Sequence, residues 1–207
     1  MHVPTAGGVM DAVLVLPEAG SGPGVVLLHE IFGVNAYVTR AAERLAELGY
    51  VVLVPDLFWR TDPGFTVDER DEESLARGME AAGRLDRPVA VTDAIAALGA
   101  LRGRPEVTGR VGVLGFCLGG ALAYLAAAEG DPDAAVCYYG SGIADALDAA
   151  AEITCPVLFH FGAEDRFIPR EQADRVAALA AGRPELTCHI HAGAGHAFDN
   201  PAPMFHG

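Results

Sequence analysis

The chain has 207 residues, about the length of one domain, and 51% of them are apolar, which is enough for a large core. Its 14 basic and 28 acidic residues give a formal net charge of −14, which repels nucleic acid phosphates and the anionic face of a membrane, so neither is an expected partner. No run approaches the roughly 18 apolar residues of a membrane span, and the start "MHVPTAGGVM" lacks the pattern of a signal peptide. We expect one domain over residues 1–207, located in the cytoplasm.

Short apolar runs alternate along the chain with longer segments of helical period, which predicts a mostly parallel sheet with helices on both faces and no large separate lid domain. The predicted strands cover residues 11–17, 23–30, 51–56, 110–115, 134–140, 155–162 and 186–191. The predicted helices cover residues 36–50, 88–103, 118–130 and 170–182. Between residues 56 and 87 the periodicity weakens, and we expect one helix within a segment that is either functional or a solvated acidic loop.

One cysteine lies at a predicted turn between a strand and a helix. In "GFCLGG", Cys117 stands between Gly115 and Gly119, and Gly120 follows. A nucleophile at such a turn needs small neighbours two residues away on either side, and the following helix directs its positive end at the sulfur. The other three cysteines are in or beside apolar strand-like runs, as expected of small buried hydrophobes: Cys137, Cys155 and Cys188.

A carboxylate and a histidine follow Cys117 in the order that this kind of turn requires, each just beyond a later predicted strand. "HFGAEDRFIP" supplies Asp165, with Glu164 as its neighbour and competitor, and "HAGAGHAF" supplies His196. The alternating pair His189 and His191 shares one face of a strand, where a metal pair is possible but a third ligand is not apparent. The remaining histidines have weaker claims, with His160 expected in the core: His2, His29, His160 and His206.

These residues suggest roles in nucleophilic catalysis. His196 would take the proton of the Cys117 thiol, and Asp165 would orient the imidazole and stabilise its charged form. Backbone N–H groups of Leu118 and Ile31 would hold the oxyanion. Glu30, at the end of a central strand, has no role in a simple catalytic triad. The alternative to a catalytic role is a structural glutamate in a salt bridge.

A set of motifs in this chain resembles the dienelactone hydrolase family, whose members are carboxymethylenebutenolidase-like enzymes of the α/β-hydrolase fold. The motifs are "HEIFGVN", "PDLFWR", "GFCLGG", "YYGSG", "HFGAEDRFIP" and "GAGHAF", spread over nearly the whole chain in family order. The resemblance implies a Cys117, His196 and Asp165 triad. It also gives Glu30 a task, because the family glutamate meets the resting thiol and helps to deprotonate it when substrate binds.

The family also holds a substrate carboxylate with two arginines. Here one of these positions is Asn200, and the other aligns near Leu75, with Arg70 and Arg77 only loosely placed. An anionic substrate therefore does not follow from the resemblance. The candidates for substrate contact are Phe32, Trp59, Arg70, Arg77, Tyr138 and Phe198.

The leading hypothesis is a cysteine hydrolase that cleaves small esters or lactones through a thioester, without cofactor or metal. The alternatives are a ligand-binding protein without catalysis and a thiol redox sensor of the same fold. The sequence leaves monomer and homodimer open. Only eleven residues follow His196, so the C-terminal helix of the fold is expected to be missing from this chain.

Overall fold

The computed structural model describes residues 1–71 and 73–202, which form a mixed layered structure around one eight-stranded sheet. The strand order is β1-β2-β4-β3-β5-β6-β7-β8, and all pairs from β4 to β8 are parallel. The strands are β1 (His2–Thr5), β2 (Gly8–Val15), β3 (Gly22–Leu28), β4 (Val51–Pro55), β5 (Val107–Phe116), β6 (Ala135–Tyr138), β7 (Val157–Gly162) and β8 (Leu186–His191). The α-helices are α1 (Ala36–Glu47), α2 (Ser74–Gly83), α3 (Arg87–Arg102), α4 (Leu118–Glu129) and α5 (Arg170–Ala181).

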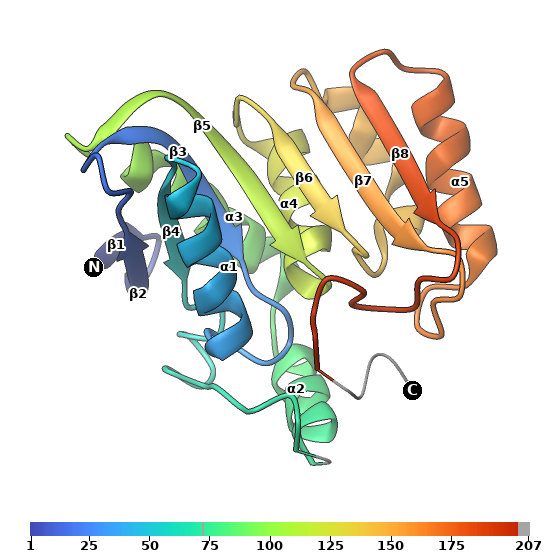
Figure 1. Ribbon diagram of the computed structural model, residues 1–207, viewed down its shortest axis with the longest axis horizontal. Helices are drawn as coiled ribbons and strands as arrows, with labels where there is room; N and C mark the ends of the chain where they lie inside the picture. Colours follow the sequence, from blue (N-terminus) through green and yellow to red (C-terminus); the bar gives the residue numbers. More distant parts are fainter. Residues whose placement is uncertain (72, 203–207) are drawn as a thin grey trace.

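Helices lie on both faces of this sheet, as the sequence predicted. In Figure 1, α1 lies in front of the sheet and α3 and α4 lie behind it, while α5 lies beside β8. No described helix covers the front of β6, β7 and β8 in that view. The expectation about a missing C-terminal helix concerns chain beyond residue 202 and falls outside the described residues.

The central strands form because their residues can be buried on both sides. Every residue of β4 is buried, and β3 is buried over its last three residues, which matches their continuous apolar sequence. The predicted elements all occur, with ends shifted by a few residues. The sequence reading missed β1, which pairs with β2 as an antiparallel hairpin, because a four-residue strand carries too little periodicity to be seen.

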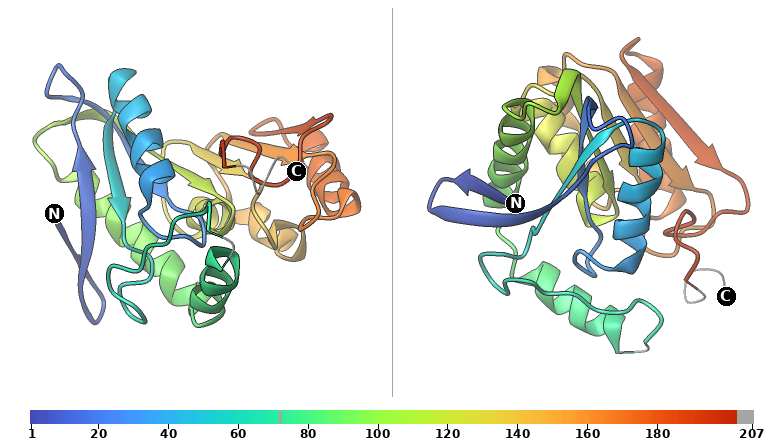
Figure 2. Two further views of the ribbon diagram at one scale, coloured as in Figure 1. Left: turned by 60° about the horizontal axis from the view of Figure 1, so that its bottom comes forward. Right: turned by 60° about the vertical axis from the view of Figure 1, so that its left-hand side comes forward.

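The segment between residues 56 and 87 contains one helix, as predicted. This helix, α2, lies beyond the carboxyl ends of the parallel strands and away from the sheet (Figures 1 and 2). Ligands bind outside the carboxyl ends of strands in open α/β sheets. The position of α2 therefore makes it a wall of any site at this edge.

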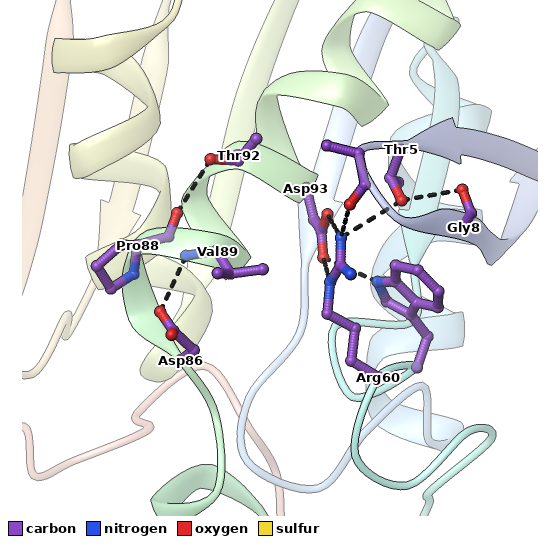
Figure 3. A network of polar contacts seen from close by, with 10 residues as sticks. Thr5, Gly8, Arg60, Asp86, Pro88, Val89, Thr92 and Asp93 are labelled. Carbon is purple, nitrogen blue, oxygen red and sulfur yellow. Dashed lines mark hydrogen bonds and ion pairs between the residues drawn. The ribbon is translucent and has the colours of Figure 1, made fainter.

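A buried carboxylate anchors the start of this segment. Asp93 of α3 is only 2% exposed and accepts hydrogen bonds from Trp59 Nε1 at 2.8 Å and from Arg60 at 2.8 and 2.9 Å (Figure 3). Arg60 also donates to the carbonyl oxygen of Ala6 at 2.8 Å. This network joins the chain after β4 to α3 and to the N-terminal hairpin.

In residues 1–71 and 73–202, no helix combines the length and apolar character that crossing a membrane requires. The cytoplasmic location stays a prediction.

Candidate active site

The turn between β5 and α4 holds Cys117 in a strained backbone conformation, with φ 52° and ψ −112°. A Cβ at Gly115 would lie 2.0 Å from the carbonyl oxygen of Gly119, and a Cβ at Gly119 would lie 2.2 Å from that of Leu28. Both contacts are far inside van der Waals distance and involve backbone, so only glycine fits. The turn is therefore built for the residue between the two glycines, because strain of this kind persists only where the surroundings enforce it.

Loops after β7 and β8 bring an acid and a histidine to Cys117. His196 Nε2 lies 3.2 Å from Cys117 Sγ, and His196 Nδ1 lies 2.8 Å from Asp165 Oδ2. The Asp165 side chain is fully buried, and its other oxygen accepts the N–H groups of Phe167 and Ile168 at 2.7 and 2.9 Å. The structure thus brings together the three residues that the sequence singled out, which lie 79 and 31 positions apart along the chain.

The surroundings of His196 favour its charged form. Burial alone lowers the pKa of His196, but its hydrogen bonds to Asp165 and Cys117 outweigh that effect and raise the pKa above its ordinary value. An imidazole that is easily protonated between a carboxylate and a thiol can accept the thiol proton and hold it. Glu164, the competing acid, is exposed to solvent.

The backbone N–H groups of Leu118 and Ile31, predicted to hold an oxyanion, have no hydrogen-bond acceptor among the described residues. Leu118 is the first residue of α4, so its N–H has no partner within the helix. Neither this N–H nor that of Ile31 donates a hydrogen bond to any residue that the structure describes. Leu118 and Ile31 both line the cavity that contains Cys117.

Glu30 is buried beside this site and 1% exposed. Its Oε2 accepts a hydrogen bond from Asn200 Nδ2 at 3.0 Å, and its Oε1 has no hydrogen-bond partner among the described residues. Burial raises the pKa of Glu30 to about 7, against the opposing effects of the Asn200 hydrogen bond and the His196 charge. Asn200 therefore holds Glu30 in this structure, and no salt bridge to Glu30 occurs among the described residues.

A cavity of about 270 Å³ opens at Cys117. Its apolar wall comes from three residues of one face of α2, together with Phe32 and Phe167, and Arg87 and Ser141 also line it. The α2 residues follow helical spacing at positions i, i+4 and i+7: Leu75, Met79 and Ala82. Of the six side chains predicted to contact substrate, Phe32 alone lines this cavity.

The other five side chains do not line this cavity, and substrate contact by any of the six stays a prediction. Trp59 is engaged with Asp93, as described above. Arg70 pairs with Asp68 at a separate surface pocket, and Arg77 lies over the ring of Phe65, 6.0 Å from its centre. These residues belong either to the loop that leads to α2 or to the side of α2 that faces away from the cavity. The sequence alone does not show in which direction their side chains point.

Tyr138 and Phe198 also point away from the cavity. Tyr138 stacks on His160 at 4.6 Å, and Phe198 packs on Tyr138 and on His191. Residues alternate across a strand, so Tyr138 faces the side of the sheet opposite to that of its buried neighbour Cys137.

His160 joins the histidine pair of β8, a contact that the sequence did not predict. His160 Nδ1 lies 2.9 Å from His191 Nε2, and burial, reinforced by the two neighbouring histidines, lowers the pKa of His160 to about 4. His160 is half-buried rather than a core residue. Among residues 1–71 and 73–202 no group of three His, Cys, Asp or Glu side chains is arranged to hold a metal ion.

The sequence reading missed most of the cavity lining. A signal existed for α2, whose apolar residues recur at helical spacing, and for Phe167, which follows Asp165 by two positions. Arg87 gave none, because an arginine at the start of a helix looks like ordinary surface. Its place in the cavity depends on how α3 packs.

Comparison with known proteins places the chain in a family. The profile of the dienelactone hydrolase family matches residues 10–206. The carboxymethylenebutenolidase of Pseudomonas putida is 36% identical over 192 residues, which cover 93% of this chain and 81% of that protein. The carboxymethylenebutenolidase of Pseudomonas sp. strain P51 is 41% identical over 194 residues, which cover 93% of this chain and 80% of that protein.

Solved structures agree in fold. A dienelactone hydrolase-like promiscuous phosphotriesterase from metagenomic libraries matches with a TM-score of 0.79 at 29% identity, covering 97% of this chain and 83% of that one. The dienelactone hydrolase of Anabaena variabilis matches with a TM-score of 0.72 at 22% identity, covering 97% and 88%. The α/β-hydrolase fold is confirmed. The chain belongs to the dienelactone hydrolase family, which confirms the predicted enzyme class, a hydrolase of carboxylic esters or lactones.

Proposed function

We propose that this enzyme hydrolyses a small carboxylic ester or lactone with Cys117 as its nucleophile, through a thioester. The observation that carries the proposal is the position of the His196 ring, whose two nitrogens lie within reach of Cys117 Sγ and Asp165 Oδ2 at the wall of one cavity. A nucleophile joined to a base, which is oriented by a third group, is the arrangement that covalent catalysis requires.

In the first half of the reaction, His196 takes the Cys117 proton and the thiolate sulfur attacks the substrate carbonyl carbon. The carbonyl oxygen becomes an oxyanion, which the N–H groups of Leu118 and Ile31 stabilise. The carbon–oxygen bond of the ester then breaks, and His196 gives its proton to the departing alkoxide. A lactone would keep the new hydroxyl group on the acyl chain.

In the second half, water attacks the thioester carbon while His196 removes a proton from it. The same N–H groups hold the second oxyanion, and the carbon–sulfur bond breaks to release the acid. His196 returns the proton to sulfur. Asp165 stabilises the charged imidazole through both halves.

Glu30 fits this scheme through its ionisation. A carboxylate next to a developing oxyanion would oppose it, but burial keeps this carboxyl protonated below a pKa of about 7. Asn200 holds Glu30 in place, and no hydrogen bond joins Glu30 to Cys117 among the described residues. The deprotonation of the resting thiol by Glu30, implied by the family, would need this carboxyl to turn from Asn200 toward the sulfur.

The test is hydrolysis of 4-nitrophenyl acetate and of small lactones by the wild type and by the Cys117→Ala variant. We expect a loss of about a thousandfold or more in kcat. Acid quenching during turnover, followed by intact mass measurement, should reveal one acyl group on the wild type and none on the variant. The matched control is Cys188→Ala on β8, outside the cavity, which should keep wild-type turnover.

Turnover that survives the loss of Cys117 would overturn the proposal. A wild type that binds esters without hydrolysing them would favour the ligand-binding alternative. A wild type that is inert to esters but gains oxygen at Cys117 under mild peroxide would favour the redox sensor.

A further inference from the structure

A row of hydroxyl and carboxyl groups leads from the active site to the surface. Tyr37 of α1 donates a hydrogen bond to Asp199 Oδ2 at 2.8 Å, and its oxygen lies 3.4 Å from the hydroxyl oxygen of Tyr139. Tyr139 in turn acts on Glu30, since burial raises the pKa of Glu30 and hydrogen bonding from the Tyr139 hydroxyl is among the effects that oppose this rise. The chain after β8 returns across the strand ends toward α1, which places Asp199 beside Tyr37 (Figure 1).

The two ends of this row differ in exposure. Glu30, Tyr139 and Tyr37 are all buried. The Asp199 side chain is 31% exposed, and its Oδ2 lies 3.1 Å from Nη2 of Arg44, which is also exposed. The row therefore connects a buried carboxyl group at the cavity with a carboxylate that water can reach.

The hydrogen bonds of the row can all point in one direction. The Tyr37 hydroxyl gives its proton to Asp199, so the Tyr37 oxygen can only accept from Tyr139. The Tyr139 oxygen is then left to accept from Glu30, whose Oε1 has no partner in ordinary hydrogen-bond geometry among the described residues. When Glu30 is protonated, a small turn of its carboxyl group supplies that proton. The 3.4 Å between the two tyrosine oxygens exceeds an ordinary hydroxyl separation, so the two rings must also approach slightly.

Packing alone does not explain the position of Tyr139. Its backbone has φ 36°, which is rare for a bulky residue, and such strain persists only where the surroundings enforce it. Its ring lies 5.1 Å from the ring of His196. A buried carboxyl oxygen without a partner, such as Oε1 of Glu30, is costly as well. The strained residue and the unpartnered oxygen occur at the same end of the row.

We propose that Tyr139 and Tyr37 form a proton relay through which Glu30 exchanges its proton with solvent at Asp199. In the outward direction, the O–H bond of Glu30 breaks as its proton passes to the Tyr139 oxygen. The proton of Tyr139 passes to Tyr37, and that of Tyr37 passes to the Asp199 carboxylate, which releases it to water. Glu30 is left ionised and accepts a hydrogen bond from Tyr139, and each tyrosine ends with one proton, as it began. The reverse sequence returns the proton.

The two tyrosines remain uncharged in this relay. Burial, reinforced by the charge of Glu30, raises the pKa of both Tyr37 and Tyr139 above its ordinary value. Each therefore keeps a hydroxyl group, which accepts one proton as it donates another.

Charged groups act on both ends of the relay. Burial raises the pKa of Glu30 most strongly, and of the neighbouring charges His196 lowers it and Glu69 raises it. At the other end, Arg44 is the charged partner of Asp199. Removal of a tyrosine hydroxyl leaves all of these charges in place, so such a variant tests the relay itself.

The relay gives Glu30 a route to solvent that avoids the active-site cavity. Glu30 lines this cavity, whereas Tyr139, Tyr37 and Asp199 are not among its lining residues. A substrate in the cavity closes the direct route to Glu30 and leaves the row open. The use of the relay during turnover rests on the function proposed above, in which Glu30 is protonated while the oxyanion forms. The relay itself does not rest on that function.

The test measures how fast Glu30 loses its proton. At about pH 6 Glu30 should be protonated while exposed carboxyl groups are ionised, so its C=O infrared band can be identified by comparison with Glu30→Gln. After a stopped-flow jump to about pH 8, the loss of this band reports proton release. In Tyr37→Phe and Tyr139→Phe the loss should be slower by about tenfold or more, because a phenyl ring can neither accept nor donate a proton.

Two further variants complete this test. Asp199→Asn, at the partly exposed end, should slow proton release as well, and it requires no change in the core. Tyr124→Phe is the matched control and should keep the wild-type rate, because Tyr124 is also buried but donates to the carbonyl oxygen of Ala146 at 2.9 Å. Unchanged rates in Tyr37→Phe and Asp199→Asn, or equal slowing in Tyr124→Phe, would overturn the relay.

A second measurement tests the route. Alkylation of Cys117 with N-ethylmaleimide places a bulky group in the cavity. The alkylated wild type should still release the Glu30 proton at the rate of the unmodified protein. A rate as slow as that of Tyr37→Phe would show that the proton leaves through the cavity, which would overturn the relay.

Neither measurement uses turnover, so the two proposals can fail separately. Proton release that Tyr37→Phe slows, in an enzyme whose ester hydrolysis survives Cys117→Ala, would overturn the proposed function and support the relay. Hydrolysis that requires Cys117, with proton release that neither Tyr37→Phe nor Asp199→Asn slows, would leave the proposed function standing and overturn the relay.

Discussion

Two parts of the molecule line the same cavity and differ in how they are held. The strand ends carry Cys117, His196 and Glu30 on backbone that glycines bring into direct contact, and Glu30 and His196 are 1% and 9% exposed. The opposite wall is α2, which lies away from the sheet, and its Met79 is 55% exposed. Under the proposed function, we expect the strand ends to place the reacting atoms precisely and the more loosely packed wall to select the substrate.

The largest effect is expected from a substitution that adds a side chain to the closely packed strand ends. Gly119→Ala places a Cβ 2.2 Å from the carbonyl oxygen of Leu28, so the turn must open. We expect a loss of about 3 kcal/mol or more in the free energy of unfolding, measured with urea, and loss of activity. Gly99→Ala on α3 has open space and should gain up to about 1 kcal/mol. Equal stability of the two variants would contradict the contrast.

The second largest effect is expected at the hydrogen-bond network of Asp93, which fixes the start of the segment that carries α2. Asp93→Asn removes the charge that binds Arg60 and Trp59, and we expect the free energy of unfolding to fall by about 2–3 kcal/mol. The exposed pair of Asp68 with Arg70 offers the control, because Asp68→Asn should leave the unfolding midpoint unchanged. An Asp93→Asn protein as stable as the wild type would show that this network is dispensable.

The buried carboxyl group of Glu30 predicts that the stability of the protein depends on pH. The pKa of Glu30 is raised to about 7, so the folded protein keeps this proton over the range in which the unfolded chain releases it. The free energy of unfolding should therefore fall as pH rises from about 4.5 to 7, by about 1–3 kcal/mol from this group. Glu30→Gln should lose that part of the slope, which urea unfolding at several pH values would measure. Parallel slopes would count against the burial of a titrating carboxyl.

The smallest effect is expected at a contact between α2 and the strand ends. Gly78 of α2 lies against Ile31, and a Cβ there would lie 2.9 Å from the Ile31 carbonyl oxygen. Gly78→Ala should shift the segment whose N–H we propose for the oxyanion and lower kcat/KM about tenfold, with a change in stability below about 1 kcal/mol. Gly83→Ala, at the open end of α2, should have wild-type kinetics. A loss of stability without loss of kcat/KM would assign Gly78 to packing.

Prediction from the sequence worked where the signal was local. The strands and helices around Cys117 followed from apolar period and glycine spacing, and the same turn predicted the order of Asp165 and His196. It did not indicate that Trp59, Arg70 and Tyr138 lie outside the lining of the cavity, because a motif gives the position of a residue along the chain but not the direction of its side chain.

The sequence by itself determined the alternation of strands and helices and the identity of the groups that meet at the end of β5, because backbone sterics at Gly115 and Gly119 admit few other turns. Tertiary structure alone decided which residues face the cavity. Leu75, Met79 and Arg87 face it because α2 and α3 pack beyond the strand ends, and Asn200 contacts Glu30 across 170 positions of chain. Such contacts depend on the packing of distant segments, which no local pattern encodes.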